Sequence, residues 1–158
     1  MSDKLPDCTS LESVLVMMFG NDVIVRERDS KLDVDKRSVG FYLSNDNEPR
    51  RAAVCDLELA CGSGAALSRI SVHMAKEAAK SGDIPENVLA NFSEVLNVYM
   101  SLLEGAMSER VVLGDVVVPG AAKPDELNWG VLKSPKDTAN FEVDLGSYGM
   151  RSISVLAL

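Results

Sequence analysis

Histidine is almost absent from this sequence, and cysteine is scarce. The chain has one histidine, His73, and three cysteines, Cys8, Cys55 and Cys61, without a C-x-x-C spacing. One histidine excludes His-rich zinc sites and makes any Cys–His or Ser–His nucleophile pair depend on a single residue. Apolar neighbours of His73 on an expected helix favour a structural role for it. An odd number of unclustered cysteines is typical of a reducing compartment.

The sequence also lacks an excess of basic residues and a long apolar run. Lys and Arg total 16 against 24 Asp and Glu, and the formal net charge is −8. This balance, with scattered basic residues, argues against nucleic acid as a partner. No apolar run approaches the ~20 residues that span a bilayer, and the N-terminus shows no signal-peptide pattern. We therefore expect a cytoplasmic protein with no nucleic-acid or membrane partner.

With 158 residues, of which 46% are hydrophobic, the chain has the size and composition of one folded domain. We expect a single domain over 1–158, with a loose N-terminus at 1–9 and a long loop at 121–137 that holds the only tryptophan, Trp129. Hydrophobic periodicity and cap residues predict a helix at 10–20 capped by Thr9 or Ser10, and a helix ending near Lys80. Runs typical of strands occur at 22–28, 38–44, 51–58, 110–118, 138–145 and 150–156.

The stretch from Pro85 to Glu104 predicts a long amphipathic helix. Its apolar residues recur at spacings of three and four, namely Val88, Leu89, Phe92, Val95, Leu96, Tyr99, Met100 and Leu103. Pro85 suits the first helical position, and Gly105 suits the residue just past the end. The opposite face carries Asn87, Ala90, Glu94, Asn97, Ser101 and Glu104.

Glu94 and Asn97 lie one turn apart on this polar face. A carboxamide donates and accepts hydrogen bonds and can hold a water molecule in a fixed direction, while a carboxylate can engage a cation or accept a proton. The two side chains can therefore act together on one small target. The helix alone is equally compatible with an ordinary solvated face, which is the commoner case.

A glycine-rich segment with Gly62 and Gly64 is expected to form a turn between a strand and the next helix. The segment lacks Gly-Lys-Ser/Thr, and Leu67 occupies the third position of a G-x-G-x-x-G pattern. Close packing of backbones at these glycines is therefore favoured over phosphate binding. A metabolic enzyme that binds a small phosphorylated ligand at this turn is kept as a distant hypothesis.

The order of elements repeats within the chain. A helix, a strand and a hairpin occupy 10–58, and the same order returns at 86–157, with the helix at 65–80 between them. In this alignment Ser13 and Val16 are the counterparts of Glu94 and Asn97, so a site on this face would be present once. We predict an α+β fold in which two pseudo-repeated halves form a mainly antiparallel sheet packed against helices.

These features together resemble the CheC/CheX family of chemotaxis phosphatases, which is related to the flagellar switch proteins. Four strings carry the resemblance: Met17-Met-Phe-Gly20, Val39-Gly-Phe-Tyr-Leu43, the E-x-x-N signature Glu94-Val-Leu-Asn97 with Pro119 downstream, and Phe141-Glu-Val-Asp-Leu-Gly146 continuing to Ile153-Ser-Val-Leu156.

The resemblance implies an aspartyl-phosphate phosphatase that acts on the receiver domain of a response regulator. Asn97 would orient the water and Glu94 would engage a lysine of the partner, with Ala90, Ser101 and Glu104 in the partner-binding face. No cofactor would reside in this chain, because the magnesium would belong to the receiver domain. The resemblance also implies a homodimer that pairs through sheet edges.

Two residues depart from the family pattern. Ala90 stands where Asp or Ser is usual, and Ser101 stands where a small residue, often glycine, is expected. The loss of a polar group at Ala90 weakens the phosphatase interpretation more than the fold. A non-catalytic interaction module on the same fold, in a signalling or motility system, is therefore the alternative.

Overall fold

The protein is described by a computed structural model that covers residues 5–20, 22–29, 37–67, 70–105, 110–117, 132–146 and 150–158. For 100–105, 115, 150 and 151, only the backbone is described. Pro119, Trp129 and positions 121–131 of the expected long loop lie outside the described residues.

The helices are α1 (Cys8–Phe19), α2 (Leu57–Leu67), α3 (Val72–Ser81) and α4 (Glu86–Gly105). The strands are β1 (Ile24–Glu27), β2 (Ser38–Leu43), β3 (Pro49–Cys55), β4 (Val112–Val117), β5 (Asp137–Asp144) and β6 (Met150–Ala157).

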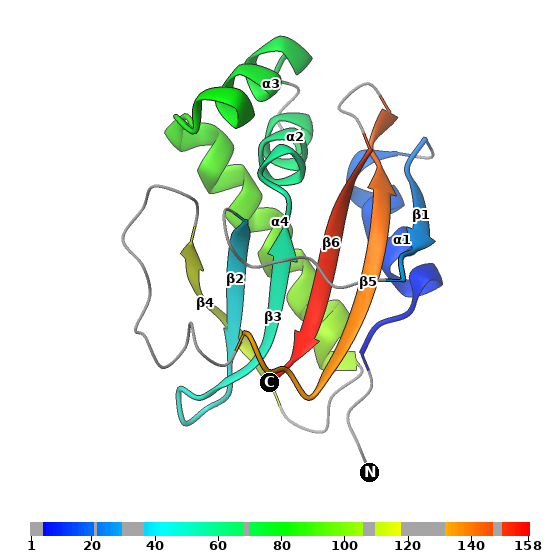
Figure 1. Ribbon diagram of the computed structural model, residues 1–158, viewed down its shortest axis with the longest axis vertical. Coiled ribbons are helices and arrows are strands. Elements are labelled where there is room, and N and C mark those ends of the chain that lie inside the picture. The colour runs from blue at the N-terminus through cyan, green and yellow to red at the C-terminus, as the bar shows by residue number, and fades with distance from the viewer. Residues whose placement is uncertain are drawn as a thin grey trace.

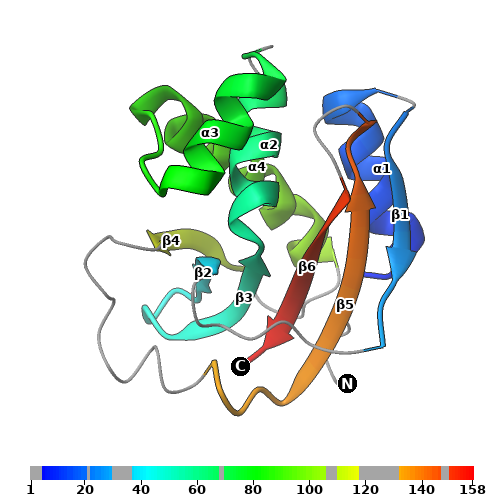
Figure 2. The ribbon, with the colours of Figure 1, turned by 45° about the horizontal axis from the view of Figure 1, so that its top comes forward.

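The described strands form one six-stranded sheet with the order β1-β5-β6-β3-β2-β4, in which all neighbours are antiparallel. Helices α1 and α4 lie on the same face of this sheet, behind it in the view of Figure 1. Helices α2 and α3 continue from the end of β3 and pack near one end of α4 (Figure 2). The predicted α+β fold with a mainly antiparallel sheet is confirmed.

The predicted repeat is present in the sheet, but the two halves exchange a strand. Strand β1 of the first half pairs with β5 of the second, and β4 of the second half pairs with β2 of the first. Hairpins β2–β3 and β5–β6 meet in the centre through β3 and β6. Reversing the strand order exchanges β1 with β4, β2 with β5 and β3 with β6, so the sheet has pseudo-twofold symmetry.

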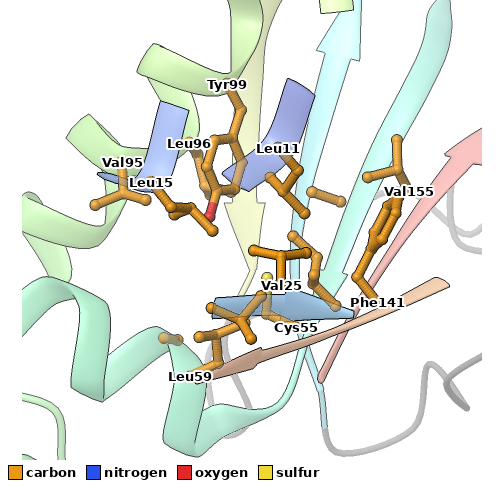
Figure 3. Close-up of a cluster of buried hydrophobic side chains, with 14 of the residues drawn as sticks. Leu11, Leu15, Val25, Cys55, Leu59, Val95, Leu96, Tyr99, Phe141 and Val155 are labelled. Carbon is orange, nitrogen blue, oxygen red and sulfur yellow. The ribbon is translucent and has the colours of Figure 1, made fainter. Parts of the chain in front are cut away.

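The main core lies between the sheet and the helices (Figure 3). Its side chains come from α1, α2, α4, β1, β2, β3, β5 and β6. Those labelled in the figure are Leu11, Leu15, Val25, Cys55, Leu59, Val95, Leu96, Tyr99, Phe141 and Val155. Full burial of such an aliphatic or aromatic side chain is worth about 1.5–3 kcal/mol relative to exposure. The apolar stripe predicted for α4 therefore fixes which of its faces points to solvent.

The opposite face of the sheet carries a smaller apolar cluster formed by Val39, Phe41, Ala52, Val54, Val117, Leu132 and Leu156. Successive residues of a strand point to opposite faces, which explains why Phe41 belongs to this cluster while Tyr42 belongs to the helix side. Leu132, in the described end of the expected loop, is fully buried here.

Helix boundaries differ from the expected ones in three places. Helix α1 begins at Cys8, and its cap is Asp7, whose Oδ1 accepts a hydrogen bond from the Ser10 N–H at 2.8 Å. Cys8 and Thr9, expected in the loose N-terminus, therefore belong to the helix. Pro85 precedes α4, where its carbonyl accepts from the Leu89 N–H, and Gly105 is the last helical residue.

The expected glycine turn is wrong. Strand β3 ends at Cys55 rather than continuing to 58, and α2 begins at Leu57, so Gly62 and Gly64 lie inside a buried helix. The expected single helix to Lys80 is two helices, because α3 starts anew after its cap, Ser71. The favoured role of these glycines, close packing, is observed at Gly64: a Cβ atom there would collide with the carbonyl oxygen of Val88 on α4.

We predict that Gly64→Ala destabilises the protein. Helix propensity alone would raise the free energy of unfolding by about 1 kcal/mol. The collision with the Val88 backbone should instead lower it by about 1–3 kcal/mol, the usual cost of overpacking. Urea denaturation of the two proteins measures this difference. A variant as stable as the wild type would contradict the close approach of α2 and α4.

Candidate functional site

The predicted polar face of α4 is exposed in the structure. Ala90, Glu94 and Asn97 are all solvent-exposed, while Val95 and Leu96 between them are fully buried. At 100° per residue the three exposed positions fall within one 60° sector of the helix. The side chains of Ser101 and Glu104 lie outside the described residues, although their backbone continues the helix. The structure thus brings together three of the five predicted site residues.

Helix α4 is held against the rest of the protein by two polar contacts that the sequence did not reveal. The hydroxyl group of Tyr42, on β2, donates a hydrogen bond of 2.6 Å to the carbonyl oxygen of Leu96. Near the start of the helix, the Asn91 Nδ2 donates to the carbonyl oxygen of Gly64 at 3.0 Å. Both partners are backbone atoms distant in sequence, so no local pattern could have indicated these contacts.

The symmetry-related helix, α1, has no equivalent of the polar pair. Leu11 and Leu15 are buried as their counterparts Phe92 and Leu96 are, which supports the predicted alignment of the two helices. Ser13, the counterpart of Glu94, is exposed, and its hydroxyl group donates to the Thr9 carbonyl within its own helix. The scaffold is duplicated, but the carboxylate and the carboxamide occur on α4 only.

The thiols and the histidine do not form a nucleophile site. Cys55 and Cys61 are buried, Cys8 donates from its Sγ to the Val25 carbonyl, and His73 is exposed on α3. Burial, with a smaller contribution from Glu58, raises the pKa of Cys61 to about 11. Burial also raises the pKa of Cys55 and of Cys8. Raised pKa values suppress the reactive thiolate at neutral pH.

The described part of the chain contains no group of three His, Cys, Asp or Glu side chains placed to hold a metal ion. None of the helices in the described ranges is both long and apolar enough to cross a membrane.

A cavity of about 300 Å³ lies between α2 and α3, lined by Glu58, Gly62, Val72, Ala75, Lys76, Ala79 and Lys80. It contains no residue of α4 and so is separate from the Glu94–Asn97 face. Because Gly62 lies inside α2, its backbone N–H belongs to a continuous helix and is not presented by a phosphate-binding turn. The hypothesis of a phosphate-binding glycine turn is therefore abandoned.

The fold has clear counterparts among solved structures. FliM from H. pylori, solved in a complex with SpeE, matches with a TM-score of 0.62 and 6% identity over 95% of this chain and 80% of that chain. CheX from Borrelia burgdorferi, in a CheX–CheY–BeF3–Mg complex, matches with a TM-score of 0.53 and 10% identity over 96% of this chain and 98% of that chain. FliY from Thermotoga maritima matches with a TM-score of 0.52 and 12% identity over 94% of this chain and 82% of that chain.

At the level of sequence, no protein-family model and no curated protein matches the chain. The structural likeness, at identities of 6–12%, establishes the fold. The protein therefore has a CheX-like fold, which FliM and FliY also share, as the resemblance in sequence predicted.

We predict that the more deeply a cysteine is buried, the more slowly its thiol is labelled. At pH 8 a thiol with a pKa of about 11 is only about 0.1% ionised, so Cys61 and the fully buried Cys55 should react only after unfolding. Cys8, which is only half-buried, should react first. Labelling with a chromogenic disulfide reagent, with and without denaturant, measures the three rates. Raising the pH towards 11 should speed the labelling of Cys61, and fast labelling of all three thiols at pH 8 would contradict the described core.

Proposed function

We propose that this protein docks the Glu94–Asn97 face of α4 onto a phosphorylated receiver domain and hydrolyses its aspartyl phosphate. The single observation that carries this proposal is the exposure of a carboxylate and a carboxamide one turn apart on a helix whose other face is fully buried. The face is presented by a helix, and its described residues, Ala90, Glu94 and Asn97, carry no hydroxyl, thiol or imidazole group. It therefore suits a reaction whose phosphoryl group and reactive cavity are supplied by the partner.

In the proposed reaction, the Asn97 carboxamide holds a water molecule in line with the phosphorus atom. The water oxygen forms a bond to phosphorus as the bond to the aspartyl oxygen breaks, which yields a free carboxylate and dihydrogen phosphate, which carries both protons of the water. The Glu94 carboxylate engages a lysine of the receiver and so fixes the two proteins in register. Hydrolysis of this kind depends mainly on positioning and charge balance.

Magnesium, in this proposal, belongs to the receiver domain, where it would neutralise phosphoryl charge. The CheX structure that shares this fold was solved with CheY, BeF3 and Mg, which supports a partner of this type. We propose a receiver domain as the partner of this chain and the cytoplasm as its location.

We predict that Asn97→Ala and Glu94→Ala each slow receiver dephosphorylation at least tenfold, because loss of one positioned group typically costs 10²-fold or more. The measurement is the decay of the phosphorylated receiver, loaded from a small phosphodonor with magnesium, with and without each protein. Asn97→Ala should still bind the receiver, since the docking face keeps Glu94. Ser13→Ala, on the symmetry-related face of α1, and Glu86→Ala, two turns from Glu94, are matched controls that should retain the wild-type rate.

Equal rates for wild type and Asn97→Ala would refute this mechanism. A second function would then gain support, namely a non-catalytic module that binds a receiver or another signalling partner through the same face. One observation favours it: Ala90 presents a methyl group where a polar side chain is usual in the family. Receiver binding without any change in phosphoryl lifetime would identify this second function.

We further propose a homodimer formed through β4. Strands β1 and β4 are the edges of the described sheet. Edge strand β1 has four residues and exposes Arg26 and Glu27 beside Ile24, and such charges at an edge discourage pairing. Strand β4 is longer, with six residues, and exposes Val112. Strand β4 is thus the better candidate for pairing with a second copy.

The dimer is tested with a matched pair of substitutions. Val112 is 51% exposed at one edge and Ile24 is 44% exposed at the other. We predict that Val112→Lys raises the dimer dissociation constant at least tenfold, because the charge must be desolvated at the interface, and that Ile24→Lys leaves it unchanged. Light scattering after size exclusion measures both. A monomeric wild type, or a dimer sensitive only to Ile24→Lys, would refute pairing through β4.

A further inference from the structure

We propose that Tyr42 is a positioning residue for the Glu94–Asn97 turn of α4. Its hydroxyl group crosses from β2 to donate a 2.6 Å hydrogen bond to the carbonyl oxygen of Leu96, the residue directly before Asn97. Tyr42 and Leu96 are both fully buried. The bond therefore joins the sheet to the helix backbone under the exposed polar pair.

This hydrogen bond is not required to complete the helix. Leu96 lies well inside α4, which continues to Gly105, so its carbonyl group can accept the ordinary helical bond from four residues later. A carbonyl oxygen has a second lone pair, and Tyr42 uses it. Water is excluded at this point, and a hydrogen bond is electrostatically stronger in such surroundings. The contact thus adds a tether between β2 and α4 at one chosen turn.

Gly40 adds a second constraint from the same strand. A Cβ atom at this position would lie 2.8 Å from the Leu96 Cδ1, so the absence of a side chain lets Leu96 settle on the strand. Gly40 and Tyr42 are two residues apart and face the same side of the sheet. One strand therefore holds both the side chain and the carbonyl oxygen of Leu96, which fixes the height and the rotation of α4 at this turn.

The consequence for activity rests on the proposed phosphatase function. Docking depends on the whole exposed face, but water placement depends on where the Asn97 carboxamide points. A displacement of about 1 Å can cost 10²-fold in rate. Loss of the tether should therefore lower kcat while the receiver affinity stays nearly unchanged, whereas a general loss of folding would lower the amount of active protein without this split.

The test compares Tyr42→Phe with Tyr99→Phe. Both variants lose one hydroxyl group from the same buried core, and Tyr99 lies on α4 itself. Of these two hydroxyl groups, it is that of Tyr42 that donates to the Leu96 carbonyl. We expect Tyr42→Phe to lower kcat about tenfold, with the KM for the phosphorylated receiver changed less than twofold. We expect Tyr99→Phe to keep both values. Amide hydrogen exchange at residues 97–100 should accelerate in Tyr42→Phe only.

Several outcomes would overturn this inference: a kcat for Tyr42→Phe equal to the wild-type value, a change confined to KM, or equal effects in both variants. If the wild type does not accelerate dephosphorylation, the proposed function fails and hydrogen exchange alone decides. Faster exchange at 97–100 in Tyr42→Phe only would support the positioning role, and unchanged exchange would refute it. If Tyr42→Phe is too unstable to assay, Gly40→Ala is tested in its place. The added methyl group displaces Leu96 from the same side of α4, so this variant should show the same loss of kcat, and an unchanged kcat would refute the inference.

Discussion

The exchange of strands between the two halves is the constraint on which the rest of the structure depends. Strand β1 completes the hairpin of the second half, and β4 completes that of the first, so each half borrows its outer strand from the other. Helix α4 belongs to the second half but is tethered by Tyr42 of the first. The contact between Tyr42 and Leu96 therefore joins the two halves across a sequence separation of 54 residues. Such non-local pairing is slow to form, because the loop between the partners must close before the contacts stabilise it.

The local elements could largely be predicted from the sequence, because they are encoded by short-range periodicity. Polar and apolar residues alternate along β5 and β6, and α4 has an apolar stripe. These patterns predicted the bounds of the three elements to within one or two residues. The repeat was also visible, since both halves have the same order of elements. The exchange of outer strands was not visible. Which hairpin an outer strand joins depends on how side chains are buried across the whole sheet, and no local pattern encodes this. Only the pairing of the strands reveals it.

The main error, the glycine-rich turn, shows how packing overrides propensity. Glycine disfavours a helix interior by about 1 kcal/mol, so Gly62 and Gly64 predicted a break between strand and helix. The structure instead builds a helix there, because α2 lies so close to Val88 of α4 that position 64 has no room for a side chain. The cap of α1 was misplaced for a simpler reason. Asp7, Thr9 and Ser10 are all good capping residues, and the sequence does not rank them.

The site itself could be predicted to the extent that it follows from helical period. Burial of Val95 and Leu96 forces Glu94 and Asn97 outward, and this is a local consequence of the sequence. Exposed helix positions tolerate most residues at little cost in stability. On α1 the exposed counterpart of Glu94 is Ser13, and the counterpart of Asn97 is Val16, which is partly buried against the core. The stability of the fold therefore does not account for the polar pair, since the same scaffold folds α1 without one. The proposed docking onto a receiver domain accounts for the pair, and in that proposal the partner supplies the phosphoryl group.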